Sequence, residues 1–224
     1  MNRLALIFAV CLPALATARE GSSKETLLRF TSFGLQENAG VEYVVAAGEV
    51  QTPPFTIPDN GFSPPVPAPG EGAVLALGKP GATPLRSLAT ITLPETGKRF
   101  LVLIFPGKGD ALKAVLVRAD DPAFRPGHVM ILNLSTESLA SDLGGKKLRF
   151  DPGSQTIFRP RRKDDLANYQ VRFYQFREGK PKIFAANLWP YFDKKRAFIF
   201  LHTDPASGSP TYRSIDEFTD WVQE

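Results

Sequence analysis

Short apolar runs separated by turn residues make up most of this chain. Two of them correspond closely: the run at 99–105 ends in a Gly-Lys-Gly-Asp turn, and the run at 196–201 leads into a turn segment at 204–208. Nearly continuous apolar, β-prone runs of this length are typical of strands that are buried on both faces. The pattern therefore predicts one β-rich unit that is written twice.

The strands that open the two units support this repeat. Residues 28–33 open the first unit and residues 130–135 open the second; 75 residues separate Leu28 from Leu103, and 69 separate Met130 from Ile199. Before the C-terminal tail, no window keeps the 3.6-residue apolar period of a helix. We expect strands at 26–33, 41–50, 72–77, 86–93, 100–105, 112–118, 128–134, 139–143, 146–150, 155–159, 169–177, 182–189, 196–202 and 211–213.

The predicted fold class is all-β, with two tandem immunoglobulin-like β-sandwich domains and a short C-terminal amphipathic helix. One larger continuous sandwich is the alternative. The polar, proline-flanked segment at 120–127 is the best boundary, which gives domains at 19–121 and 122–213. The Pro-rich segment 53–70 is expected to be an edge, a long loop or an arm that crosses between sheets, because proline donates no ladder hydrogen bond.

Local signals predict several finer features. Gly144-Gly145 and Glu178-Gly179 are expected to form tight hairpin turns, since glycine supplies the positive φ that these turns need. The apolar alternation that begins at Tyr169 breaks at Tyr174, which predicts a bulge or a covered outer face.

The acidic tail at 214–224 is the only segment whose sequence pattern predicts a helix. Ser214 and Glu217 have the spacing of a capping box, and Ile215, Phe218 and Trp221 or Val222 then fall on one face. Such a short helix must dock to persist, either on its own second domain or on a partner.

Residues 1–18 have the features of a cleaved signal peptide: Arg3, an apolar core at 4–15, and Ala16-Thr17-Ala18 before the cleavage point. This core is too short for a membrane span, and Pro13 interrupts it. A lipoprotein is disfavoured because Val10 precedes Cys11. We therefore expect export to the periplasm or the extracellular space, with no transmembrane span in the mature chain. Cys11 is the only cysteine, so the mature chain would lack disulfides, thiolate nucleophiles and cysteine metal ligands.

Three sequence features together resemble exported bacterial proteins of uncharacterised β-sandwich families. They are the opening "ILNLS", the hairpin "LGGKKLRFDPG" and the closing "LWPYFDKKRAFIFL". The resemblance covers residues 19–213 and implies fold and export; it carries over no functional residue.

Charge separates the two halves. Residues 19–121 carry 10 Lys/Arg and 11 Asp/Glu, residues 122–213 carry 16 and 8, and residues 214–224 carry 4 acidic residues and no basic ones. The basic second half favours attraction to polyanions. Nucleic acid is not an expected partner, because the chain has no basic and aromatic stacking motif.

No motif supports catalysis. The chain has no Gly-x-Ser-x-Gly elbow, and the Gly-rich segment 72–79 lacks the spacing of a phosphate loop. His128 and His202 stand at strand ends, where polar capping is a simpler role than metal binding with Asp204. A hydrolase with an unrecognised carboxylate pair, such as Asp120-Asp121 or Asp164-Asp165, is the third-ranked function. We predict no enzyme activity, no metal and no cofactor.

Two basic clusters are the candidate binding sites. Guanidinium and ammonium groups at one end of a sandwich would bind sulfate, phosphate or carboxylate groups; the Lys146-Lys147 hairpin would add to them. The alternative is that Asp164, Asp165, Asp193 and the tail neutralise them. The clusters are Arg159, Arg161, Arg162 and Lys163, and Lys194, Lys195 and Arg196.

Trp189 is a candidate sugar platform; its alternative role is to plug the core. The sequence thus predicts a non-catalytic binding or structural module of the envelope or extracellular space. Its expected partner is an anionic envelope component, a glycan or a protein, and no pattern specifies an oligomeric state.

Overall fold

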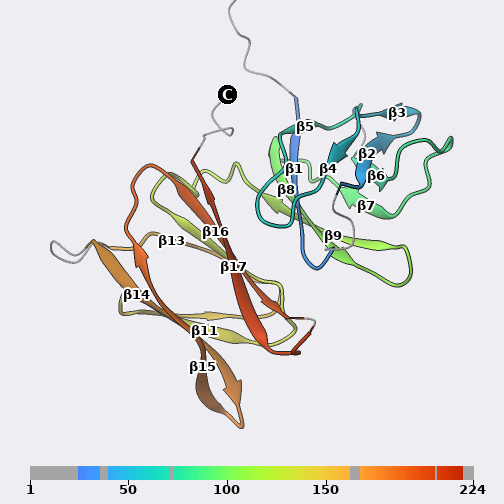
Figure 1. The fold of residues 1–224 in the computed structure, drawn as a ribbon. Coiled ribbons are helices and arrows are strands. Elements are labelled where there is room, and N and C mark those ends of the chain that lie inside the picture. Colours follow the sequence, from blue (N-terminus) through green and yellow to red (C-terminus); the bar gives the residue numbers. More distant parts are fainter. Residues whose placement is uncertain (1–24, 36–39, 71–72, 162–166, 205, 219–224) are drawn as a thin grey trace, which may run out of the picture.

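The fold is all-β in the part of the chain that the structure, a computed structural model, describes: residues 25–35, 40–70, 73–161, 167–204 and 206–218 (Figure 1). These residues form seventeen strands in four sheets and contain no helix. Accordingly, this part of the chain holds no helix that is long and apolar enough to cross a membrane. The signal peptide predicted at 1–18 lies outside the described residues.

The first nine strands form two sheets. Inner sheet 1 has the order β5-β1-β8-β9, and outer sheet 1 has the order β3-β2-β6-β7, with β4 paired to β2. The strands are β1 (Leu27–Ser32), β2 (Glu42–Ala47), β3 (Val50–Gln51), β4 (Phe55–Thr56), β5 (Val66–Pro67), β6 (Val74–Gly78), β7 (Ala89–Thr92), β8 (Arg99–Pro106) and β9 (Leu112–Arg118).

The remaining strands form two further sheets. Inner sheet 2 has the order β13-β10-β16-β17, and outer sheet 2 has the order β12-β11-β14-β15. The strands are β10 (Val129–Asn133), β11 (Leu139–Leu143), β12 (Lys146–Phe150), β13 (Gln155–Phe158), β14 (Asn168–Arg177), β15 (Lys180–Pro190), β16 (Arg196–Thr203) and β17 (Pro210–Glu217).

The two halves share one topology. Apart from β4, each strand of the first half has a counterpart in the second, and the counterparts occupy the same places in the sheets. Each half also has one parallel pair, β1 with β8 and β10 with β16, which joins the predicted opening and closing runs. The order differs from the ABED and CFG sheets of an immunoglobulin domain, so the immunoglobulin-like part of the prediction is not confirmed.

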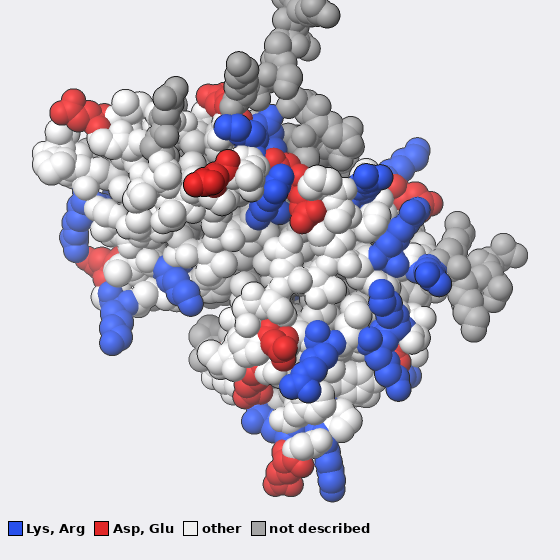
Figure 2. All heavy atoms as spheres, turned by 180° about the vertical axis from the view of Figure 1, so that it is seen from behind, with Lys and Arg blue, Asp and Glu red and all other residues white. Residues whose placement is uncertain are grey.

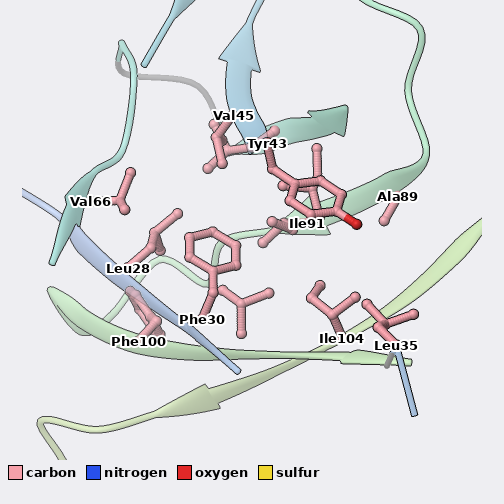
Figure 3. Packing of buried hydrophobic residues seen from close by; sticks show 13 residues of the cluster. Leu28, Phe30, Leu35, Tyr43, Val45, Val66, Ala89, Ile91, Phe100 and Ile104 are labelled. Atoms are coloured by element: carbon pink, nitrogen blue, oxygen red, sulfur yellow. The ribbon is translucent and has the colours of Figure 1, made fainter. Parts of the chain in front are cut away.

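Each half encloses its own apolar core between its inner and outer sheets. In the first half, Leu28, Phe30, Phe100 and Ile104 of inner sheet 1 point toward Tyr43 and other side chains of outer sheet 1 (Figure 3). In the second half, alternate residues of β16, namely Ala197, Ile199 and Leu201, contact side chains of β11 and β14. This face-to-face packing of two sheets is the layering of a β-sandwich.

A third core lies between the two inner sheets. Leu101 and Leu103 of β8 pack there with Phe198 and Phe200 of β16. Both strands are therefore buried on both faces over their first six residues, as their apolar runs predict. The halves are thus joined by an apolar layer rather than by the connecting segment alone.

The local turn predictions are confirmed. Gly144 and Gly145 have φ of 61° and 89° in the β11–β12 turn, and Glu178 and Gly179 have φ of 52° and 75° in the β14–β15 turn. The register of β14 against β15 shifts between Phe173 and Tyr174, at the predicted position, but the extra residue is Phe184 of β15. In β14 itself burial continues to alternate through Gln175. The Pro-rich segment crosses between sheets, because it supplies β4 to outer sheet 1 and β5 to inner sheet 1.

The predicted C-terminal helix is wrong over the residues that the structure describes. Residues 214–217 complete β17, which pairs with β16 from Thr203 back to Arg196. Side chains alternate here as in a strand: Ile215 and Glu217 are buried, whereas Ser214 and Asp216 are exposed. Glu217 pairs with Arg196 instead of capping a helix. The rest of the predicted tail, 219–224, lies outside the described residues.

Glu217 joins the two halves electrostatically. One carboxylate oxygen accepts hydrogen bonds from Arg196 of β16, and the other lies 3.3 Å from Nη1 of Arg29 on β1. Arg196 also donates to the carbonyl oxygens of Ala119 and Phe124, at 2.9 and 3.2 Å, in the segment that connects the halves. The side chains of Arg196 and Glu217 are only 3% and 2% exposed, so each charge depends on its partner.

Substitution of Glu217 by Gln tests this arrangement. The change leaves Arg196 buried without its counter-charge, so we expect the free energy of unfolding to fall by about 3–5 kcal/mol. Urea denaturation of both proteins measures the loss. Asp110→Asn removes the ion pair of Asp110 with Arg86, whose side chains are both 75% exposed, and is expected to cost less than about 1 kcal/mol. Equal losses in the two variants would contradict a structural role for Glu217.

His202 should make stability depend on pH. Burial lowers the pKa of this imidazole, which lies edge-on to Phe33 with ring centroids 5.2 Å apart. As pH falls through about 6.5, the unfolded chain binds a proton that the folded chain does not, so stability falls until the lower folded pKa is reached. Denaturation curves between pH 7 and 5 should show this loss, and His202→Phe should reduce it. An unchanged slope in the variant would assign the acid sensitivity to other groups.

Candidate functional site

The loops at one end of the second half surround a hollow of about 670 Å³. Its wall combines cations with flat apolar side chains, and among the described residues that line it Asp193 is the one carboxylate. We call it the basic hollow. Its lining residues are Gly127, Lys146, Arg159, Pro160, Arg161, Pro190, Tyr191, Phe192 and Asp193.

Four chain segments far apart in sequence form this site. The β11–β12 hairpin brings Lys146, the segment after β13 brings Arg159 and Arg161, the segment after β15 brings Tyr191, and the connection between the halves brings Gly127. Tyr191 fixes two of these segments to each other, because its hydroxyl donates to the carbonyl oxygen of Arg161 at 2.8 Å.

Gly127 allows the connecting segment to pack closely at the edge of the basic hollow. Its φ is +82°, and a Cβ atom at this position would lie 3.4 Å from the carbonyl oxygen of Phe192. Its N–H donates to the carbonyl oxygen of Lys195 at 2.8 Å. A side chain at residue 127 would therefore strain the backbone and crowd the wall of the site.

A second hollow, of about 410 Å³, adjoins the first and shares Lys146, Arg159 and Arg161 with it. These three cations thus stand between two hollows. Among the ion pairs of the described residues, none involves any of the three. Figure 2 shows Lys and Arg side chains gathered on the flank formed by the second half.

The first half provides an internal comparison. Before its closing strand it carries Lys98-Arg99 where the second half carries Lys195-Arg196, and both arginines are 3% exposed. At the positions that correspond to Lys146, Arg159 and Arg161, however, the first half has Val50, Pro67 and Pro69. The fold therefore uses the buried arginine in both copies but places Lys146, Arg159 and Arg161 in one copy only.

The second predicted basic cluster behaves differently from the first. Arg196 is only 3% exposed and pairs with Glu217, so the structure gives it a contact within the fold and not in an open site. Lys195 pairs with Asp216, and its Nζ lies 4.0 Å from the ring centroid of Phe192. Lys194 is exposed. Arg162 and Lys163 lie outside the described residues.

Trp189 belongs to an aromatic cluster on the inner side of outer sheet 2. Its ring centroid lies 5.9 Å from that of Phe173 and 5.8 Å from that of Tyr212. The ring of Tyr169 lies edge-on to that of Trp189, with centroids 6.2 Å apart, and its centroid lies 4.9 Å from that of Tyr191 in a tilted arrangement. Burial raises the pKa of the Tyr169 hydroxyl. Trp189 therefore packs against the core, and Tyr191 and Phe192 are the aromatic residues at the site.

The other candidate chemistries find no geometric support in the described part of the chain. No group of three or more His, Cys, Asp or Glu is placed there to hold a metal ion. Asp120 accepts hydrogen bonds from Arg118 and from the Lys98 N–H, and Asp121 caps the Ala123 N–H. Both carboxylates thus hold loops in place, and Asp164-Asp165 lies outside the described residues.

Neither known protein families nor curated proteins include a match to this sequence. The function of this chain therefore has to be inferred from the geometry of the site.

Proposed function

We propose that this chain is an exported, non-catalytic binding module that holds a polyanion at the basic hollow. The observation that carries the proposal is the convergence of Lys146, Arg159 and Arg161 around one hollow. Export to the periplasm or the extracellular space, predicted from residues 1–18, is part of this proposal.

The chemistry of the wall supports this function. Guanidinium groups bind sulfate, phosphate and carboxylate in a bidentate manner, and they are more weakly hydrated than ammonium groups. Tyr191, Phe192 and two prolines give the exposed cations apolar neighbours in the wall of the hollow. The first half has the same topology with uncharged residues, Val50, Pro67 and Pro69, at the corresponding positions, which supports a role for these cations beyond the fold itself.

The proposal predicts salt-dependent retention on heparin resin. Arg159→Ala combined with Arg161→Ala should weaken binding by roughly tenfold or more at low salt, which is about 1.4 kcal/mol. The variant should also elute at lower salt, because fewer counterions are released when it binds.

Arg177→Ala combined with Lys180→Ala is the matched control. It removes the same charge from exposed positions at the β14–β15 turn of the same half, and it should change retention much less. Similar losses in both double variants would mean that net charge alone drives binding. Failure of the unmodified protein to bind at low salt would end the proposal.

A further inference from the structure

A third hollow lies beside the basic hollow and has different chemistry. It measures about 730 Å³ and contacts the basic hollow through Tyr191, which lines both. Of the described residues that line it, Asp142 alone is charged, and Asn168 and Gln170 add two amides. We call it the neutral hollow. Both hollows have the size of pockets that bind small molecules.

The neutral hollow also has an exposed apolar floor. Leu188 is 70% exposed, and it stands opposite Gln170 in the pairing of β14 with β15. An apolar side chain beside amides and a carboxylate matches a sugar ring, which has an apolar C–H face and a rim of hydroxyl groups. Amides donate to and accept from hydroxyls, and a carboxylate accepts from them.

The Asp142 carboxylate argues against a second anionic group in this hollow. Its Oδ1 accepts a hydrogen bond from the Gly145 N–H at 2.8 Å, which holds it at the rim. A negative group placed beside it would be repelled, whereas an uncharged hydroxyl would donate to it. The two hollows therefore select different parts of one ligand.

We infer that the ligand is an acidic glycan in which charged and uncharged sugar units adjoin. A carboxylate- or sulfate-bearing unit occupies the basic hollow, the neighbouring uncharged unit occupies the neutral hollow, and Tyr191 stands between them. This inference rests on the proposed function, because it takes the basic hollow as the anion site and adds the class of polymer that it binds.

Two polymers that carry the same anionic group can distinguish binding of any polyanion from binding of an acidic glycan. Hyaluronate oligosaccharides alternate a carboxylate-bearing sugar with an uncharged one, and poly-glutamate carries carboxylates without sugars. Calorimetric titration at low salt should show both binding, with the oligosaccharide roughly tenfold tighter at matched carboxylate content.

The variant Gln170→Ala with Leu188→Ala then tests the neutral hollow. We expect it to remove the roughly tenfold preference for the oligosaccharide and to leave poly-glutamate affinity unchanged. Ile183→Ala is the control, since Ile183 lies on the same strand, is 48% exposed and lines neither hollow. A thermal melt of each protein shows whether it is folded. If the double variant folds poorly, Gln170→Ala alone tests the preference for the oligosaccharide.

The outcomes are distinguishable. Equal affinity of the unmodified protein for both polymers, or an unchanged preference in the variant, would overturn the glycan inference and leave the polyanion function standing. Loss of the preference in Ile183→Ala as well would also overturn it. Absence of binding to either polymer at low salt would overturn the proposed function itself.

Discussion

Burial of β8 and β16 on both faces is the constraint on which this architecture depends. Each strand contributes alternate side chains to the core of its own half and to the layer between the inner sheets. Such strands accept polar side chains only at their ends, and there both carry a buried arginine, Arg99 and Arg196. A buried charge needs a partner. Glu217 meets this need for Arg196 and, through Arg29, connects the edge strand of one half to the other half.

The same packing determines where the candidate site can form. Arg196 holds the connecting segment through the carbonyl oxygens of Ala119 and Phe124, and Gly127 then lies against the residues that follow β15. The loops of the second half therefore converge beside a segment that the apolar layer has already fixed. Cations that the fold needs are paired and buried, whereas Lys146, Arg159 and Arg161 line an open hollow. Packing thus separates the structural charges from those that remain accessible to a ligand.

Local patterns predicted most of the strands, both tight hairpins and the irregular pairing near Tyr174, because turn chemistry and side-chain alternation act over a few residues. Crossing between sheets was one of three roles expected for the Pro-rich segment. The C-terminal strand was predicted at 211–213, but its continuation to Glu217 was predicted as a helix. Ser214 and Glu217 suit a helix cap and an alternating strand equally, and the partner that decides, Arg196, is distant in sequence. The burial of Arg196 was also missed. The Lys-Arg pair before both closing runs was an available signal, since a feature repeated in both units belongs to the fold. The neutral hollow has no sequence signature, because pairing across β14 and β15 creates it.

The last strand of outer sheet 2, β15, leaves one edge of that sheet open. β15 spans eleven residues and ends its sheet, so one side of its backbone has no strand beside it in the described part of the chain. Long open edges are templates for pairing between molecules. Here Lys180 and Lys182 repel a second copy in parallel register, Pro181 lacks an N–H to donate, and the irregular register at Phe173 and Tyr174 twists the ribbon. These features disfavour edge-to-edge pairing of the longest hairpin with a second copy of the chain.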